Sequence, residues 1–307
     1  MSMFMVNNYT PTRVVFGAGR LGELATMRLP GRKTMIFVTA DGLMEKLGIQ
    51  QRVLELLKQN GVEAVVYDKI TPNPYRKYVM EARDIAKFPA ISIIDPELML
   101  SLPRTLTLYQ GFDALFHLSE CYITNNHENR LVDVYSEEGI RIITKWLPVV
   151  AEDGGNLEAR LNMSYAANIL AGYTQSLINC TSHHITAQTL GGLFPKVAHG
   201  ASLIMIAEEY YKRVLRYFPD LFDEMGEFMG VRRNEDVKGT GFLNGLINLL
   251  DSTDMRILSM SEYGIKRSDC AKIADMTVNN TGIEDMDRYP EKLTAEDIKG
   301  ILERSYR

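Results

Sequence analysis

The spacing of hydrophobic residues changes near residue 105. Before it, short apolar runs rich in β-branched residues occupy residues 12–16, 33–39, 62–67 and 90–94. Each run has the length and composition of a strand. After it, long windows of apolar residues follow helical spacing. The pattern predicts an α/β N-terminal half with a parallel sheet, followed by an all-helical half.

The second and third runs are separated by one helical segment. Residues 43–60 carry leucines at helical spacing, and Gly61 follows as a stop signal. A strand, a helix and a strand of these lengths predict a parallel βαβ unit. We therefore expect two domains, an α/β nucleotide-binding-like domain at 1–98 and an all-α domain at 99–307.

Composition narrows the choice of partners. The 307 residues carry a net charge of -5, with a pI near 5.7, which gives no reason to expect binding to nucleic acid or to an anionic membrane. No apolar run reaches membrane-spanning length, and the first residues do not read as a signal peptide, so a cytoplasmic location is expected. Three cysteines without metal-motif spacing are expected to be reduced.

Candidate metal ligands lie in the helical half. Asp113 and His117 are four positions apart in a segment that reads as helix, so both side chains leave the same face. His183, His184 and His199 follow downstream. Adjacent residues on a helix point about 100° apart, so only one of the tandem histidines can face a shared cation. One carboxylate and three imidazoles would complete a metal site.

Two features of the N-terminal half can be interpreted as parts of a dinucleotide-binding site. Residues 17–22 read Gly-Ala-Gly-Arg-Leu-Gly and fit a nucleotide-binding fingerprint, but a tight strand-to-helix turn explains them equally well. Ala40 and Asp41 follow the second strand, where an acidic residue can bond the adenosine ribose. Asp41 could equally start a helix at Gly42.

Several stretches resemble the iron-containing (group III) alcohol dehydrogenases, including the butanol dehydrogenase and lactaldehyde reductase branches. They occur in the family's order, at residues 11–19, 93–98, 111–117, 184–200 and 293–298. The resemblance implies a metal-dependent enzyme that transfers hydride between NAD or NADP and a small alcohol or aldehyde, with no nucleic-acid or membrane partner. A homodimer is the commonest assembly for such a soluble protein.

The resemblance also assigns roles. It implies that Asp113, His117, His184 and His199 bind the metal and are catalytic, and this donor set suits Fe(II) or Zn(II). It places Gly17 and Gly19 near the cofactor. It also places Ala40, rather than Asp41, nearest the position that discriminates NAD from NADP, and this slightly favours NADP as the cofactor. Gln188 stands where the family often has a histidine near the nicotinamide.

One departure from the family leaves two hypotheses open. Residues 74–90 lack the family's Gly-Gly-Gly-Ser turn and its Thr-rich segment, and about 95 residues precede the helical half, whereas a doubly wound domain takes about 150. The sheet is therefore expected to be truncated. The chain is either an alcohol dehydrogenase or a metal-binding remnant of the family without dinucleotide binding and redox activity.

A set of acidic residues around the candidate ligands has a simpler interpretation. We expect these residues to form a solvated helix face rather than a second metal site. They are Glu120, Glu128, Asp133, Glu137 and Glu138.

Overall fold

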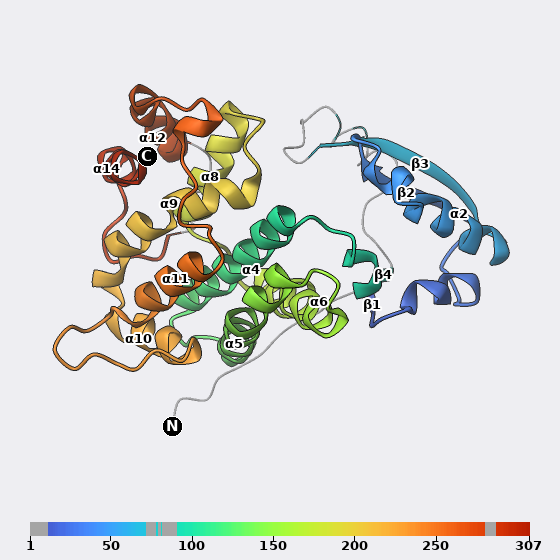
Figure 1. Cartoon of the computed structure of the whole chain (residues 1–307), viewed down its shortest axis with the longest axis horizontal. Helices are drawn as coiled ribbons and strands as arrows, with labels where there is room; N and C mark the ends of the chain where they lie inside the picture. Colours follow the sequence, from blue (N-terminus) through green and yellow to red (C-terminus); the bar gives the residue numbers. More distant parts are fainter. Residues whose placement is uncertain (1–11, 72–77, 79–80, 82–90, 280–286) are drawn as a thin grey trace. The chain divides into compact units, whose positions relative to one another are not determined.

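The computed structural model describes residues 12–71, 78, 81, 91–279 and 287–307. The chain separates into two compact units, and the division falls between Ser101 and Leu102. Figure 1 draws both units, coloured along the sequence. The domain limits 1–98 and 99–307 stay a prediction. Most of residues 74–90, where the family's phosphate-binding turn is missing from the sequence, lies outside the described residues.

The described residues of the first unit form four strands, as the apolar runs predict. They pair in parallel as β1 with β4 and β2 with β3. The strands are β1 (Arg13–Phe16), β2 (Lys33–Thr39), β3 (Glu63–Ile70) and β4 (Ile91–Ile94). Since β2 and β3 flank a helical segment and run parallel, the predicted βαβ unit is confirmed.

The helix predicted at residues 43–60 is interrupted. The structure has α1 (Leu43–Lys46) and α2 (Ile49–Gln59), separated at Gly48. Gly48 adopts a φ of 72°, a left-handed conformation that ends one helix and that glycine adopts without steric cost. The prediction of one continuous helix is therefore wrong at this residue.

Asp95 organises the turn after β1. Its carboxylate accepts hydrogen bonds from the backbone N–H groups of Gly19 (3.0 Å) and Leu21 (2.9 Å), and it caps η2 (Pro96–Met99) through Glu97 N–H. The turn leads into the short η1 (Arg20–Ala25). Asp95 is buried, so the end of β4 holds the glycine-rich turn in place.

The second unit is helical throughout its described residues, as predicted. Its main helices are α4 (Arg104–Asn125), α5 (Arg130–Glu152), α6 (Leu157–Ser164), α7 (Gly172–Leu177), α8 (Ser182–Leu193), α9 (His199–Val214), α10 (Pro219–Phe228), α11 (Gly241–Ser252), α12 (Cys270–Asn279) and α14 (Ala295–Ser305). A π-helical segment, η3 (Tyr165–Ala171), joins α6 to α7. None of the helices described is long and apolar enough to cross a membrane.

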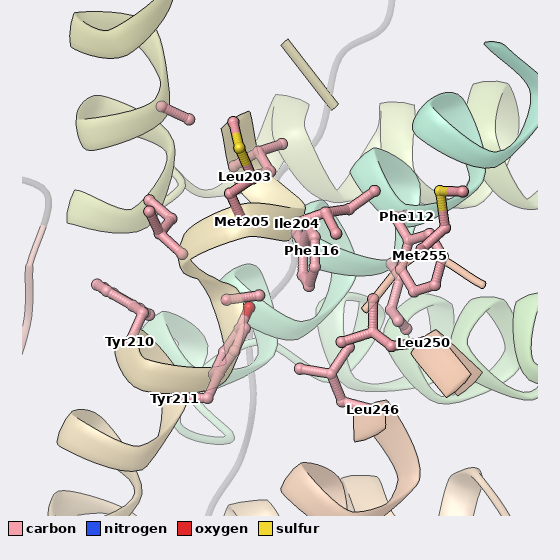
Figure 2. Close-up of a cluster of buried hydrophobic side chains, with 14 of the residues drawn as sticks. Phe112, Phe116, Leu203, Ile204, Met205, Tyr210, Tyr211, Leu246, Leu250 and Met255 are labelled. Atoms are coloured by element: carbon pink, nitrogen blue, oxygen red, sulfur yellow. The ribbon is translucent and has the colours of Figure 1, made fainter. Parts of the chain in front are cut away.

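Helix α4 is the central element of this unit. It packs against α5, α9 and η3, and sixteen of its 22 residues are buried. Figure 2 shows Phe112 and Phe116 of α4 among side chains of α9 and α11. Because apolar burial is the main stabilising term in folding, this core fixes the relative positions of the helices that carry the candidate ligands.

Helices α4 and α9 approach closely at Gly200. A Cβ atom at this residue would lie 2.4 Å from the carbonyl oxygen of Tyr109 and 2.7 Å from its carbonyl carbon. A side chain at residue 200 would force the backbones apart. The absence of a side chain there lets His199, its neighbour, approach α4.

Replacing Gly200 with alanine should therefore destabilise the protein. We expect Gly200→Ala to lower the free energy of unfolding by about 1–3 kcal/mol, the usual range for overpacking. Gly192→Ala is the matched control, because this helical glycine has nothing within 4 Å of its Cβ position. Urea titrations that gave equal stabilities for the two variants would contradict a close α4–α9 contact.

Candidate metal centre

Three helices of the helical unit, α4, α8 and α9, supply the candidate site. On α4, Asp113, His117 and Glu120 are spaced i, i+4 and i+7, so their side chains leave one face of the helix. His184 lies in the first turn of α8, whose N-terminus is capped by the Thr181 side chain. His199 is the first residue of α9. Helix periodicity and two helix starts therefore place all four predicted ligands at one point.

The imidazoles converge on one oxygen atom. Asp113 Oδ1 lies 3.2 Å from His184 Nε2, 3.4 Å from His117 Nε2 and 3.6 Å from His199 Nε2. Ligand atoms of Asp113, His184 and His199 all lie within 4.8 Å of one another. The ring of His117 stacks on that of His184, with centroids 4.2 Å apart.

These separations fit a shared divalent cation. Ligand atoms about 2.0–2.2 Å from a tetrahedral ion lie about 3.3–3.6 Å apart, which matches the three distances from Asp113 Oδ1. The side chains of Asp113, His117 and His199 have relative solvent exposures of 27% to 30%. The donor set is thus open to solvent on one side, as a catalytic metal site must be to admit a substrate.

The electrostatics of the cluster favour a cation. Burial lowers the pKa of His117 to about 4, with a further contribution from His184, and burial likewise lowers the pKa of His199. Both imidazoles are therefore neutral near pH 7. Burial also opposes a charge on His184, but Glu120 and Asp113 outweigh it and raise the pKa of His184 to about 10. Surroundings that favour a proton here also favour a divalent metal ion.

Glu120 is a residue that sequence reasoning placed wrongly. It was expected on a solvated helix face, but it is fully buried. Its Oε1 atom lies 2.6 Å from His184 Nδ1 and 3.0 Å from His183 Nδ1. Burial raises the pKa of this carboxyl, but the neighbouring histidines lower it well below its usual range, so Glu120 is ionised. Its spacing of seven residues from Asp113 indicates the ligand face of α4 but not its burial.

The rest of that acidic set divides in two. Asp133 is also buried, where it accepts a hydrogen bond of 2.7 Å from Asn125 Nδ2, so the expectation of solvation is wrong for it as well. Glu128 and Glu138 are exposed and Glu137 is half-buried, as a solvated face requires.

His183 faces away from the ligand cluster. Its Nε2 atom lies 3.1 Å from the carbonyl oxygen of Leu203, and its ring stacks on Tyr210 at 4.8 Å. Both ring nitrogens are therefore occupied inside the core. This agrees with the expectation that only one of two adjacent histidines can point toward a shared cation.

Cys180 is a second neighbour that the sequence did not reveal. Its Sγ atom lies 3.0 Å from His117 Nδ1 and accepts a hydrogen bond of 2.8 Å from Gln175 Nε2. All three cysteines are free, as expected. A thiol thus contacts the ring nitrogen of His117 that does not face Asp113.

Four of the five residues predicted to contact the cofactor belong to a different unit from the candidate ligands. Gly17, Gly19, Ala40 and Asp41 belong to the first unit. Asp41 is exposed, and its Oδ1 accepts hydrogen bonds from Thr39 and from Leu43 N–H at the start of α1, which lower its pKa. The hydrogen bond from Leu43 N–H therefore supports the interpretation that Asp41 starts a helix.

The remaining cofactor candidate, Gln188, is in the second unit. It is exposed on α8, one turn after His184.

Comparison with known proteins assigns both halves of the chain to one family. The family model described as "Fe-containing alcohol dehydrogenase family, C-terminal" matches residues 107–306, and "Iron-containing alcohol dehydrogenase" matches residues 11–94. The chain belongs to the iron-containing alcohol dehydrogenase family. The resemblance inferred from the motifs is thereby confirmed.

Individual relatives show how far the likeness extends. The 1,3-propanediol dehydrogenase of Klebsiella pneumoniae is 30% identical over 224 residues, which cover 71% of this chain and 55% of that protein. The NADH-dependent butanol dehydrogenase A of Thermotoga maritima shares the fold with a TM-score of 0.84 at 21% identity, covering 99% of each chain. The chain spans about half the length of the first curated relatives it matches.

Removing one ligand should empty the site without unfolding the protein. We expect His199→Ala to keep its helical circular dichroism spectrum, because His199 is partly exposed and the core does not depend on it. Metal content measured by mass spectrometry should fall at least about tenfold. His127→Ala is the matched control, since this half-exposed histidine pairs with Asp133 and Glu224 instead. An unfolded His199→Ala variant would show that the site is structural.

Proposed function

We propose that this protein is a metal-dependent alcohol dehydrogenase or aldehyde reductase that transfers hydride between NAD or NADP and a small alcohol or aldehyde. The observation that carries the proposal is the convergence of three imidazole Nε2 atoms on Asp113 Oδ1 at 3.2, 3.4 and 3.6 Å. Membership in the iron-containing alcohol dehydrogenase family supports it.

The chain's own residues would create the conditions for this reaction. Asp113, His117, His184 and His199 would hold Fe(II) or Zn(II), because imidazole and carboxylate donors suit both ions. When bound, the cation supplies electrophilic polarisation of an alcohol or aldehyde oxygen, which hydride transfer requires. The partial exposure of Asp113, His117 and His199 leaves a path for a small substrate.

Binding of the dinucleotide is the second half of the proposal. Gly17, Gly19, Ala40, Asp41 and Gln188 are the candidate contacts. Ala40 carries no carboxylate to exclude a 2′-phosphate, which leans toward NADP. A relative with the same fold is named NADH-dependent, so both dinucleotides must be tested. A homodimeric assembly and a cytoplasmic location also stay predictions.

One observation favours the alternative of a metal-binding remnant. A glycine-rich turn binds phosphate through free backbone N–H groups. At residues 17–22, the N–H groups of Gly19 and Leu21 already donate to Asp95. The turn is therefore organised by the protein's own carboxylate, and phosphate donors would have to come from elsewhere.

Titration and turnover separate the two functions. If this chain is an enzyme, calorimetry of the metal-loaded protein should detect the binding of NADH or NADPH. Oxidation of 1,3-propanediol or butanol by the protein should also produce the reduced nicotinamide cofactor. We expect affinity for the dinucleotide at least about tenfold, or about 1.4 kcal/mol, weaker than in a full-length relative. Asp113→Asn should keep that binding while losing turnover. Stoichiometric metal binding with no dinucleotide binding at millimolar concentration would establish the remnant.

A further inference from the structure

Two of the three candidate ligand imidazoles have a hydrogen-bonding partner at the ring nitrogen that does not face Asp113. His184 Nδ1 lies 2.6 Å from Glu120 Oε1, and His117 Nδ1 lies 3.0 Å from Cys180 Sγ. In both rings, Nε2 is the atom near Asp113 Oδ1. The two rings therefore share one arrangement, with a hydrogen-bonding partner behind and the ligand cluster in front.

This arrangement selects one tautomer of each ring. A neutral imidazole carries a proton on one nitrogen and a lone pair on the other. An ionised carboxylate can only accept, so the hydrogen bond to Glu120 requires the proton of His184 on Nδ1. When a metal ion takes the place of the second proton, the lone pair that it binds is therefore on Nε2.

Glu120 is itself held rigidly. Its Oε2 atom accepts hydrogen bonds from Thr181 N–H (2.7 Å) and Thr181 Oγ1–H (2.6 Å), while Oε1 contacts both His183 and His184. The carboxylate is fully buried, and electrostatic hydrogen bonds are stronger in such surroundings than in water. Four partners therefore prevent the carboxylate from rotating away from His184.

The acceptor behind His117 is weaker. A thiol sulfur accepts hydrogen bonds poorly compared with a carboxylate. Cys180 Sγ is positioned by Gln175 Nε2 at 2.8 Å. The contact at His117 should therefore contribute less to orientation than the contact at His184.

We propose that Glu120 and Cys180 are positioning residues that keep the protons of His184 and His117 on Nδ1 and thereby present both Nε2 atoms to the metal. The inference rests on the metal site of the proposed function and adds to it the two residues that orient its ligands. In this role both residues act through the ligand imidazoles and are not ligands themselves.

The first test replaces Glu120 with glutamine. The amide cannot accept from both His184 and Thr181 N–H with a single oxygen, so one of these bonds is lost. For folded Glu120→Gln, we expect Co(II) affinity to fall about 10- to 100-fold and the visible absorption of bound Co(II) to change. Ser119→Ala is the matched control, because Ser119 is the preceding buried residue of α4 and bonds Tyr211 instead.

The second test compares two cysteines. Cys180→Ala removes the acceptor at His117 and should weaken Co(II) binding about fivefold, as expected for loss of one neutral hydrogen bond. Cys270→Ala should leave Co(II) affinity unchanged, because Cys270 is also a buried cysteine but lies on α12, a helix that carries no candidate ligand. Equal effects of the two substitutions would contradict the positioning role of Cys180.

A measurement on the wild-type chain keeps the proposal testable if Glu120→Gln does not fold. Nitrogen-15 NMR of the Zn(II)-loaded, histidine-labelled protein should show His184 and His117 protonated on Nδ1. A folded Glu120→Gln with unchanged Co(II) affinity and spectrum would overturn the proposal while leaving the metal site intact, whereas a proton on Nε2 of His184 in the Zn(II)-loaded protein would overturn both. Failure of the wild-type chain to bind Co(II) would instead overturn the metal site and the proposed function with it.

Discussion

The helical unit must satisfy a cluster of charged and polar side chains inside an apolar core. An unpaired buried charge costs several kcal/mol, so each such group needs a partner. Glu120 meets this requirement through Thr181, His183 and His184, and Asp113 meets it through three imidazoles. The positions of α4 and α8 are coupled through these contacts, because neither helix can shift without leaving a charge unpartnered.

The same constraint explains how the site stays both ordered and accessible. Glu120 and His184 lie almost completely within the core, whereas Asp113, His117 and His199 keep part of their surface exposed. Gly200 permits the close approach of α9 to α4 that brings His199 to the cluster. Rigid surroundings on the buried side therefore support a donor set that faces solvent on the other.

Sequence patterns predicted much of this architecture. The strands follow runs of β-branched residues, and the one-turn spacing of Asp113 and His117 placed them on one helix face. The break at Gly48 was missed. A glycine within a helical pattern can either continue the helix or adopt a left-handed conformation that ends it, and the sequence does not show which of the two occurs. The role of Asp95 was missed for a different reason, since its partners Gly19 and Leu21 lie more than 70 positions away.

Glu120 shows most clearly what sequence could not reveal. An acidic residue on a helix is usually solvated, and only partners from a distant segment make its burial favourable. Those partners, Thr181, His183 and His184, are about 60 positions away. Its position seven residues after Asp113 put it on the ligand face, but spacing alone does not distinguish a buried orienting carboxylate from an exposed one.

The most direct test of the account is a crystal structure of the Zn(II)-loaded protein with anomalous data at the zinc edge. The account predicts one anomalous peak about 2.0–2.2 Å from Asp113 Oδ1 and from Nε2 of His117, His184 and His199. A zinc ion bound instead to Cys180 or Glu120, or a peak lacking any of the four predicted ligands, would contradict it.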